Sequence, residues 1–300
     1  MPRVITPGFL DAMFQGFNVK FNDAFKGTPI TWSRVGMEVP STGESENYGW
    51  LGQFPRFREW IGDRVSTSLN AYGHVIKNKK WESTISIPRE QIADDKYGMF
   101  SPMFAEMGRS AAVFPDEQIY GLMKLGFTTN CYDGQYFFDV DHPVLDASGV
   151  AQSVSNYQSG SGNPWFLLDA TRAIKPMIWQ VREQVEMVSK VDPNSSDQVF
   201  MRDEYSYGAR LRANAGFGLW QLAAGSKATL NSANFRLLRQ GMLNLKGDYG
   251  RPLGLMPSLL VCGSSNEAAA RDLLWAEKLA NGASNTDFKL VDLLIVPWLD

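Results

Sequence analysis

Strict alternation between apolar and polar positions marks one segment of the chain as a β-strand. In the run 81–87, one face carries Trp81, Ser83, Ile85 and Ile87, and the other carries Glu82, Thr84 and Ser86. A period of two places successive side chains on opposite faces of a strand. The polar run 77–80 separates it from the mixed run 64–76, so we expect a turn there and a long two-stranded ribbon within residues 48–89.

This ribbon needs support from outside itself, because an isolated hairpin is at best marginally stable in water. A neighbouring copy of the chain is the natural support. Aromatic and arginine side chains dominate buried contacts between proteins, although about half of the aromatic residues would simply fill the core of their own chain. The expected contacts between subunits are Trp50, Phe54, Arg56, Phe57, Arg58, Glu59, Trp60, Lys77, Lys79, Lys80 and Trp81.

Two segments show helical spacing. Near the N-terminus, phenylalanines recur at intervals of three to five residues from Phe9 to Phe25, which predicts one helical face that packs either on its own chain or on a neighbour. A second helix is expected around Met103, Phe104 and Met107. Pro115 would either kink this helix or open its continuation.

Shorter patterns fill the rest of the chain, and together they predict an α+β fold. Strands are expected at 177–187, where a helix also fits the spacing, and at 205–213, 258–262 and 291–298. Helices are expected from Asp169 to Ile174, over 233–245, and from Ser264 or Ser265 to Leu279. The stretch 127–164 is rich in turn-forming residues.

Composition narrows the functional class. A chain of 300 residues that is 44% hydrophobic can bury a substantial core, and it has no apolar run long enough to span a membrane and no signal peptide. The two cysteines are expected to be free thiols. A net charge of −3 argues against specific nucleic-acid binding and is compatible with a wall that encloses DNA without gripping it.

Candidate chemistry is sparse. Asp139, Asp141 and His142 could form a metal cluster, but a turn whose aspartates bond their own backbone explains the same residues. The chain contains no Gly-x-Ser-x-Gly elbow, no phosphate-binding loop and no His-Glu-x-x-His pair. We therefore expect no catalytic residue, no cofactor and no metal, and an assembly role in place of an enzymatic one.

Several sequence blocks resemble one known family. They are 47–55, 58–64, 131–139, 141–145, 216–223, 246–254 and 296–299. These blocks resemble the major head (capsid) proteins of phage Mu and Mu-like prophages, the gpT family, over nearly the whole chain. The resemblance implies the Hong Kong 97-type capsid fold and a subunit of an icosahedral shell in a virion, made in the cytoplasm of a host bacterium.

The same resemblance implies an organisation and a set of partners. It divides the chain into an N-terminal arm (1–47), an extended β-hairpin loop (48–89), a peripheral domain with a spine helix (90–230) and an axial-type domain (231–300). The implied partners are further copies in hexamers and pentamers, enclosed double-stranded DNA, a scaffold or protease, a portal and a decoration protein. No membrane is implied.

Some relatives of this fold join their subunits through a lysine of the extended loop. The amine must be neutral for that reaction, whereas Lys77, Lys79 and Lys80 form a charged cluster, so non-covalent assembly is expected. Two alternatives remain open at this point. One is another phage structural protein, such as a tail tube or portal subunit, and the other is a metal-dependent enzyme built on Asp139, Asp141 and His142.

Overall fold

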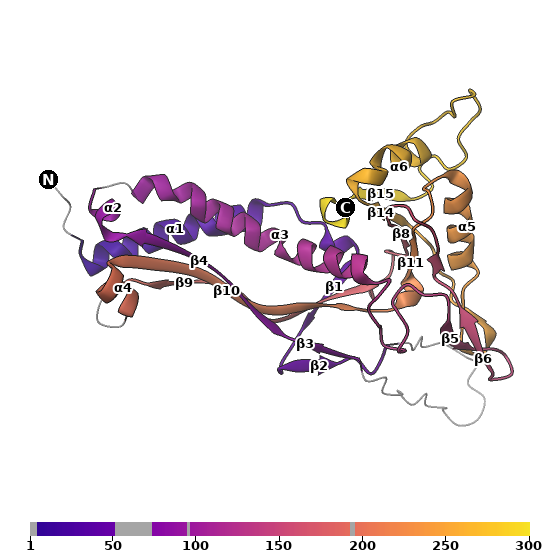
Figure 1. Cartoon of the computed structure of the whole chain (residues 1–300), viewed down its shortest axis with the longest axis horizontal. Coiled ribbons are helices and arrows are strands. Elements are labelled where there is room, and N and C mark those ends of the chain that lie inside the picture. Colours follow the sequence, from indigo (N-terminus) through magenta and orange to yellow (C-terminus); the bar gives the residue numbers. More distant parts are fainter. Residues whose placement is uncertain (1–4, 52–73, 95–96, 193–195) are drawn as a thin grey trace.

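The computed structural model describes residues 5–51, 74–94, 97–192 and 196–300. Figure 1 shows an extended unit joined at one end to a compact unit. The extended unit contains α1 (Pro7–Gly27), β1 (Gly36–Pro40), β4 (Lys79–Pro88), α3 (Ser101–Leu125), β9 (Met177–Lys190) and β10 (Glu204–Phe217). The compact unit contains β7 (Tyr157–Gln158), β8 (Trp165–Leu168), β11 (Ala223–Ser226), α5 (Ser232–Leu243), β14 (Leu259–Cys262), α6 (Glu267–Leu274) and β15 (Asp292–Ile295).

Short elements connect or flank these two units. They are η1 (Trp32–Arg34), β2 (Ser45–Asn47), β3 (Val75–Lys77), α2 (Arg89–Ala93), η2 (Tyr97–Phe100), β5 (His142–Leu145), β6 (Ala151–Val154), α4 (Asp197–Arg202), η3 (Trp220–Leu222), β12 (Lys246–Gly247), η4 (Asp248–Gly250), β13 (Arg251–Pro252), η5 (Ser264–Asn266) and η6 (Pro297–Leu299). This mixture of helices and sheets confirms the predicted α+β class.

A four-stranded sheet in the order β1-β9-β10-β4 forms the backbone of the extended unit. Strands β9 and β10 are 14 residues each, so the antiparallel pair spans about 45 Å at the usual rise per residue. The short helix α4 lies at the far end of this pair (Figure 1). The strands predicted at 177–187 and 205–213 are therefore confirmed, and both are longer than expected.

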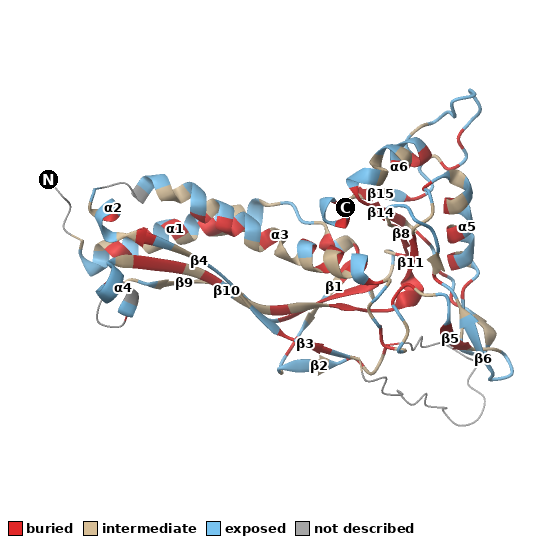
Figure 2. Cartoon of the chain, in the orientation of Figure 1, coloured by how far each residue is buried: buried red, intermediate tan, exposed pale blue. Residues whose placement is uncertain are grey.

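Helices α1 and α3 cover one face of this sheet (Figure 1). The ring of Phe17 stacks on that of Phe104 with centroids 4.0 Å apart, and the edge of Tyr207 meets both rings. These aromatic residues lie in one buried cluster with Leu10 and Ile87. Figure 2 shows the buried residues concentrated between the helices and the sheet. The N-terminal helix thus packs on its own chain.

The predicted ribbon has a different pairing from the expected one. Strand β4 is real and its predicted apolar face is correct, since Trp81 contacts Phe114 of α3 with ring centroids 4.8 Å apart. However, β4 pairs along its whole length with β10, from Pro88 opposite Glu204 to Lys79 opposite Ala213. The predicted pairing of 81–87 with 64–76 is therefore wrong for the described residues. The end of the second run belongs to β3, which pairs with β2 instead.

The expected turn at 77–80 is instead a junction between two sheets. Asn78 is only 8% exposed, and its side-chain amide donates to Ser41 Oγ at 2.7 Å and to the Gly43 carbonyl at 3.0 Å. Its amide oxygen accepts a 2.8 Å hydrogen bond from Gln180. A polar side chain that bonds three partners inside the molecule cannot form a solvated tip.

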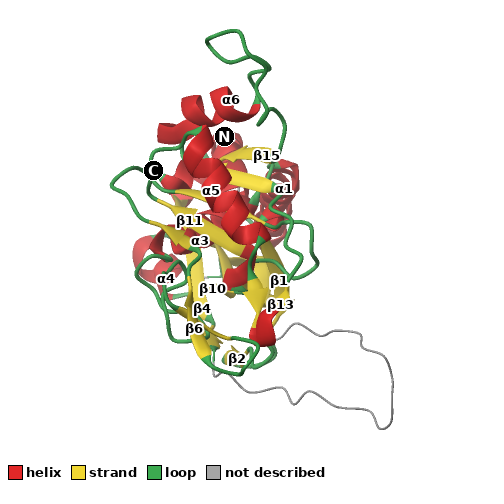
Figure 3. Ribbon diagram, turned by 90° about the vertical axis from the view of Figure 1, so that its right-hand side faces the viewer, coloured by secondary structure: helices red, strands yellow, loops and turns green. Residues whose placement is uncertain are grey.

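The compact unit has a five-stranded sheet in the order β15-β14-β8-β11-β7 with apolar residues on both faces. Side chains alternate along β8, so that Trp165 and Leu167 pack against α5 and α6. Phe166 and Leu168 pack in a second hydrophobic cluster on the other face, which we call the central core. Figure 3, turned to face this unit, shows α5 and α6 in front of the strands. The sheet contains β11, which precedes residue 230, and β14, which follows it. It therefore includes strands from both sides of the domain boundary expected at residue 230.

Three predicted elements are corrected in extent. The predicted helix at 169–174 is absent, because the buried Asp169 carboxylate accepts hydrogen bonds from Thr171 and Arg172 in a local turn. Helix α6 ends at Leu274 and a turn follows, closed by the 2.8 Å bond from the Leu279 amide to the Ala283 carbonyl. The last strand ends at Ile295, before η6.

Pro115 lies inside α3, and the helix continues past it to Leu125. The next residue, Asp116, fixes the connection to β1. Its carboxylate is 5% exposed and accepts hydrogen bonds from the backbone amides of Trp32, at 2.6 Å, and Thr31. Burial raises the pKa of Asp116 above its usual value despite these hydrogen bonds. The N-terminal segment is thus tied to α3 by polar as well as apolar contacts.

The two long helices cross at Gly108. A Cβ atom there would lie 2.2 Å from the carbonyl oxygen of Phe21, a backbone atom of α1. Gly121, on the same helix, has no such neighbour within 4 Å. The chain therefore contains a matched pair of helix glycines, of which only one is required by a close approach.

We predict opposite effects for alanine at these two sites. Gly108→Ala should lower the free energy of unfolding by about 3 kcal/mol, because α1 must move off α3. Gly121→Ala should raise it by about 0.5–1 kcal/mol through helix propensity. Urea unfolding of the unassembled chain, followed by circular dichroism, measures both. Equal stabilisation by the two variants would show that the helices do not cross as described.

Candidate functional site

The free end of the extended unit exposes an apolar patch. Its residues are Phe200 and Met201 of α4, 78% and 76% exposed, Met99 of η2, 74% exposed, and Met103 at the start of α3, 50% exposed. Figure 1 shows α4 and the start of α3 at the same end of the extended unit. We call these four residues the tip patch. Large apolar side chains exposed at one end of a molecule make that end a candidate surface for binding another molecule.

The tip patch was not among the sequence candidates. Phe200 and Met201 lie between two strands, after the buried Val199 and before the polar Arg202 and Asp203. The apolar run 199–201 was a usable signal, because a helix as short as α4 can bury only part of such a run. Met103 was assigned to a buried helix face, whereas it is half exposed.

Strand β4 forms one edge of the extended sheet. Along this edge Lys80, Glu82 and Thr84 are exposed, and Thr84 donates a 2.7 Å hydrogen bond to the Glu82 carboxylate. The outward edge of an outer strand presents backbone groups that can pair with another chain, and charged side chains limit such pairing. The β4 edge is therefore suited to polar contacts and resists indiscriminate strand addition.

The described sequence candidates fall into two groups, two tryptophans that pack within the chain and three lysines. Trp50 packs against the central core, and Trp81 donates its indole N–H to the Ala213 carbonyl at 2.9 Å. Lys77, Lys79 and Lys80 follow one another along β3 and β4. The other candidates, Phe54, Arg56, Phe57, Arg58, Glu59 and Trp60, lie outside the described residues.

Lys77 forms an ion pair with Glu44 at 2.8 Å, with both side chains more than 70% exposed. An exposed pair adds little to stability, but it affects the amine. The hydrogen bond and charge of Glu44 raise the pKa of Lys77 above its usual value. Lys77 is therefore held as a cation, the form that cannot attack an amide.

The uncovered face of the extended sheet carries exposed ion pairs. Arg210 lies 3.2 Å from the carboxylate of Glu183 and 3.8 Å from that of Glu186, and Arg212 lies 3.1 Å from Glu183. Opposite charges that neutralise each other leave this face without a basic stripe. A surface of this kind gives little attraction for a polyanion.

The three residues of the proposed metal cluster do not converge. The Asp139 carboxylate accepts hydrogen bonds from the backbone amides of Tyr136, at 3.1 Å, and Val140, at 2.7 Å. His142 instead lies 2.7 Å from Asp133. No cluster of potential metal ligands among the described residues contains Asp139 or Asp141. None of the described helices combines the length and apolar character that a membrane crossing requires.

Comparison with known proteins gives one consistent result. The family described as Mu-like prophage major head subunit gpT matches residues 10–299. The major capsid protein of Escherichia phage Mu is 41% identical over 285 residues, which cover 93% of each chain. The Mu-like prophage FluMu major head subunit of Haemophilus influenzae is 38% identical over 301 residues, which cover 97% of each.

Solved structures agree with the sequence comparison. A chain from the procapsid of bacteriophage JBD30 superposes with a TM-score of 0.88 at 45% identity, covering 98% of this chain and all of that one. A chain from the JBD30 capsid superposes with a TM-score of 0.78 at 34% identity, covering 99% of this chain and all of that one. The resemblance found in the sequence blocks is thereby confirmed, together with the capsid fold.

Proposed function

The chain belongs to the family of Mu-like prophage major head subunits and is a shell-forming capsid protein, and from this we propose how it assembles. Copies of the chain form hexamers and pentamers that close into an icosahedral shell around double-stranded DNA. The contacts are non-covalent, and the chain performs no catalysis. Membership of this family removes the tail-tube and portal alternatives.

One observation supports this proposal most strongly. The extended unit ends in the tip patch, whose Phe200 and Met201 are more than three-quarters exposed. Burial of one such side chain against a neighbour stabilises an interface by about 1.5–3 kcal/mol. Modest contacts of this size, repeated at every subunit, allow errors to dissociate before the shell closes. We assign the tip patch to contacts between neighbouring copies.

The contacts between subunits that were predicted from the sequence are also part of this proposal. We propose that residues 48–89, which include Trp50, Lys79 and Lys80, contact a neighbouring copy, with the polar β4 edge giving specificity. Trp50 and Trp81 pack within their own chain, so their contribution is to position this edge. Charged groups at the rim of an interface give specificity more than affinity.

DNA is enclosed without being bound in a specific manner. The net charge is −3, and Arg210 and Arg212 are paired with carboxylates. Tight counterion-releasing contacts would hold the genome to the wall while the shell is filled. The remaining proposed partners are a scaffold or protease, a portal and a decoration protein, and we propose assembly in the host cytoplasm before release as a virion.

The tip patch yields a prediction about assembly. In the double variant Phe200→Ser, Met201→Ser, we expect the yield of particles to fall at least about tenfold, because a loss of 1.4 kcal/mol at a contact is already a factor of ten. The unassembled chain should keep its circular dichroism spectrum, since neither side chain is buried. Sedimentation and negative-stain microscopy measure the yield.

Met256→Ser is the matched control, because Met256 is 59% exposed but lies in the compact unit, away from the tip patch. We expect a smaller loss of particles with this variant. Unchanged assembly of the double variant would remove the tip patch from the set of contacts.

Non-covalent assembly has a direct test. Particles boiled in denaturing detergent should run as a single band of chain size, because Lys77 is held as a cation. The triple variant K77R/K79R/K80R keeps the charge but cannot form an amide bond, and it should assemble as well as the parent chain. A ladder of bands in the parent that disappears in the triple variant would contradict the prediction.

DNA affinity should be weak. In filter binding at low salt, we expect the chain to lack submicromolar affinity for plain duplex DNA. The dependence of log affinity on log salt should be shallow, because few phosphates would be neutralised. Submicromolar binding with a steep salt dependence would show that the protein grips DNA.

A further inference from the structure

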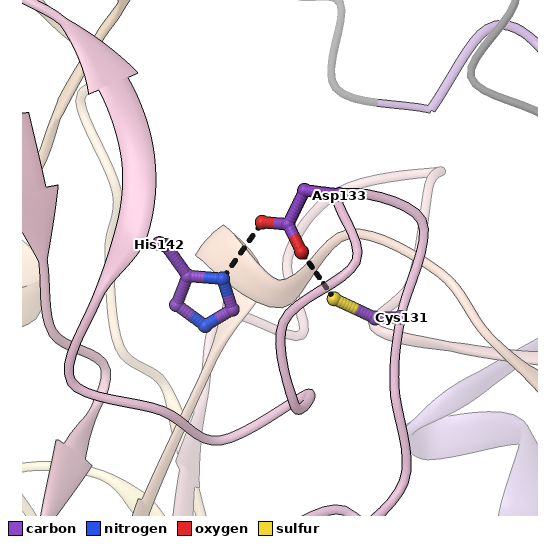
Figure 4. A group of neighbouring side chains, drawn as sticks. All are labelled: Cys131, Asp133 and His142. Atoms are coloured by element: carbon purple, nitrogen blue, oxygen red, sulfur yellow. Dashed lines mark hydrogen bonds and ion pairs between the residues drawn. The ribbon is translucent and has the colours of Figure 1, made fainter. Parts of the chain in front are cut away.

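Three buried side chains, none of them among the proposed shell contacts, have the chemistry of a metal site. Cys131, Asp133 and His142 present a thiol, a carboxylate and an imidazole whose ligand atoms all lie within 4.8 Å of one another. Figure 4 shows Asp133 between the other two. The side chain of His142 is fully buried, that of Asp133 is 6% exposed, and Cys131 is 6% exposed.

A tight turn brings the first two ligands to one side. The Cys131 amide donates to the Gln135 carbonyl at 2.8 Å, and the Gly134 amide donates to the Cys131 carbonyl at 3.2 Å. Gly134 has a φ of 90°, in the region that favours glycine. The Gln135 amide also donates to Asp133 Oδ1 at 3.1 Å, which fixes the carboxylate in place.

Asn156 determines which nitrogen of His142 holds a proton. Its side-chain NH₂ faces three backbone carbonyls, those of Phe137, Ala223 and Trp220, at 2.8, 3.1 and 3.3 Å. Its oxygen therefore faces the other way, where it accepts from the Asp139 amide at 2.9 Å and meets His142 Nε2 at 3.2 Å. Nε2 must be the donor in this contact, so it has the proton.

The lone pair of a neutral His142 then lies on Nδ1, which is 2.7 Å from Asp133 Oδ2. Two acceptors cannot face each other at this distance, so one proton lies between them here, in the position that a metal ion bound to Nδ1 would replace. Cys131 Sγ is 3.1 Å from the other oxygen, Oδ1. Burial and the nearby Asp133 carboxylate raise the pKa of the Cys131 thiol.

We propose that Cys131, Asp133 and His142 bind a thiophilic divalent cation of the Zn²⁺ class through Sγ, a carboxylate oxygen and Nδ1. Thiolate, carboxylate and imidazole are the donors that zinc prefers. Binding releases two protons, one from the thiol and one shared between Nδ1 and Asp133. The thiolate and the carboxylate then balance the charge of the ion, so the buried site is neutral. The three side chains leave one position of a tetrahedral site for a further ligand.

The surroundings match those of known metal sites. A histidine that binds a metal usually donates its other ring N–H to a fixed acceptor, and Asn156 is such an acceptor. The ring of Trp220 stacks on His142 with centroids 3.8 Å apart, which holds the imidazole in plane. Zinc would separate the ligand atoms to about 3.3 Å or more, given bond lengths near 2.0–2.3 Å. A shift of the turn at Gly134, its one exposed residue, would supply this small movement.

The consequence of binding is structural. The turn 131–135 and the start of β5 would be joined through one ion to Asn156 and Trp220, which belong to the central core region. A metal ligated by groups that are distant in the unfolded chain adds its binding free energy to folding. The site would therefore stabilise the loop region 127–145 without taking part in shell contacts.

Cobalt substitution of the purified full chain tests this proposal. We expect equimolar binding of Co²⁺ with a thiolate-to-cobalt charge-transfer absorption, displaced by Zn²⁺, and a higher unfolding temperature with Zn²⁺ than with chelator. Cys131→Ser should abolish the absorption, and Asp133→Asn or His142→Gln should weaken binding at least about tenfold. Wild-type chain that binds neither ion at micromolar concentration would overturn the proposal.

The chain supplies its own controls, because it contains only two cysteines and two histidines. Cys262→Ser and His74→Gln should both leave the cobalt spectrum unchanged. An absorption that survives Cys131→Ser but is lost in Cys262→Ser would also refute the assignment. Particle assembly is recorded on the same samples by sedimentation, so loss of the metal with assembly retained separates this proposal from the proposed function.

Discussion

The length of the β9/β10 pair is the constraint on which the rest of the structure depends. Two strands of 14 residues extend far beyond the compact unit, and a ribbon of this kind is not stable alone in water. Helices α1 and α3 supply the missing apolar surface, with Phe17 and Phe104 stacked on each other and both in edge contact with Tyr207. Their close crossing at Gly108 brings both helices down onto the same face, so the N-terminal helix is part of the core.

Covering one face of the sheet leaves the opposite face and the free end to solvent, and the two surfaces differ in chemistry. The open face carries paired charges such as Arg210 with Glu183, which keep it soluble and unselective. The free end instead exposes Phe200 and Met201, whose burial against a neighbouring copy would favour association. A subunit with apolar surface at its far end and polar surface along its length favours contacts at defined points over random aggregation.

Sequence patterns predicted the elements of this fold better than their partners. The alternation from Trp81 to Ile87 correctly gave the strand and its buried face, because a period of two depends on the strand alone. It could not give the pairing with β10, since residues 81 and 211 are far apart in sequence and backbone hydrogen bonds leave no pattern in side chains. Asp169 was similarly ambiguous, because the same side chain can cap a helix or close a turn.

The buried chemistry was harder to predict for a related reason. His142 was grouped with Asp139 and Asp141 because they are close in sequence, yet both aspartates precede β5, and the Asp139 carboxylate accepts from the backbone amides of Tyr136 and Val140. The turn at Gly134 instead brings Asp133 and Cys131 to the imidazole. Proximity in space here depends on the orientation of Asn156, which is set by three carbonyls from separate segments. No local pattern records such a network, so the hydrogen-bond partners of both His142 nitrogens follow only from the folded structure.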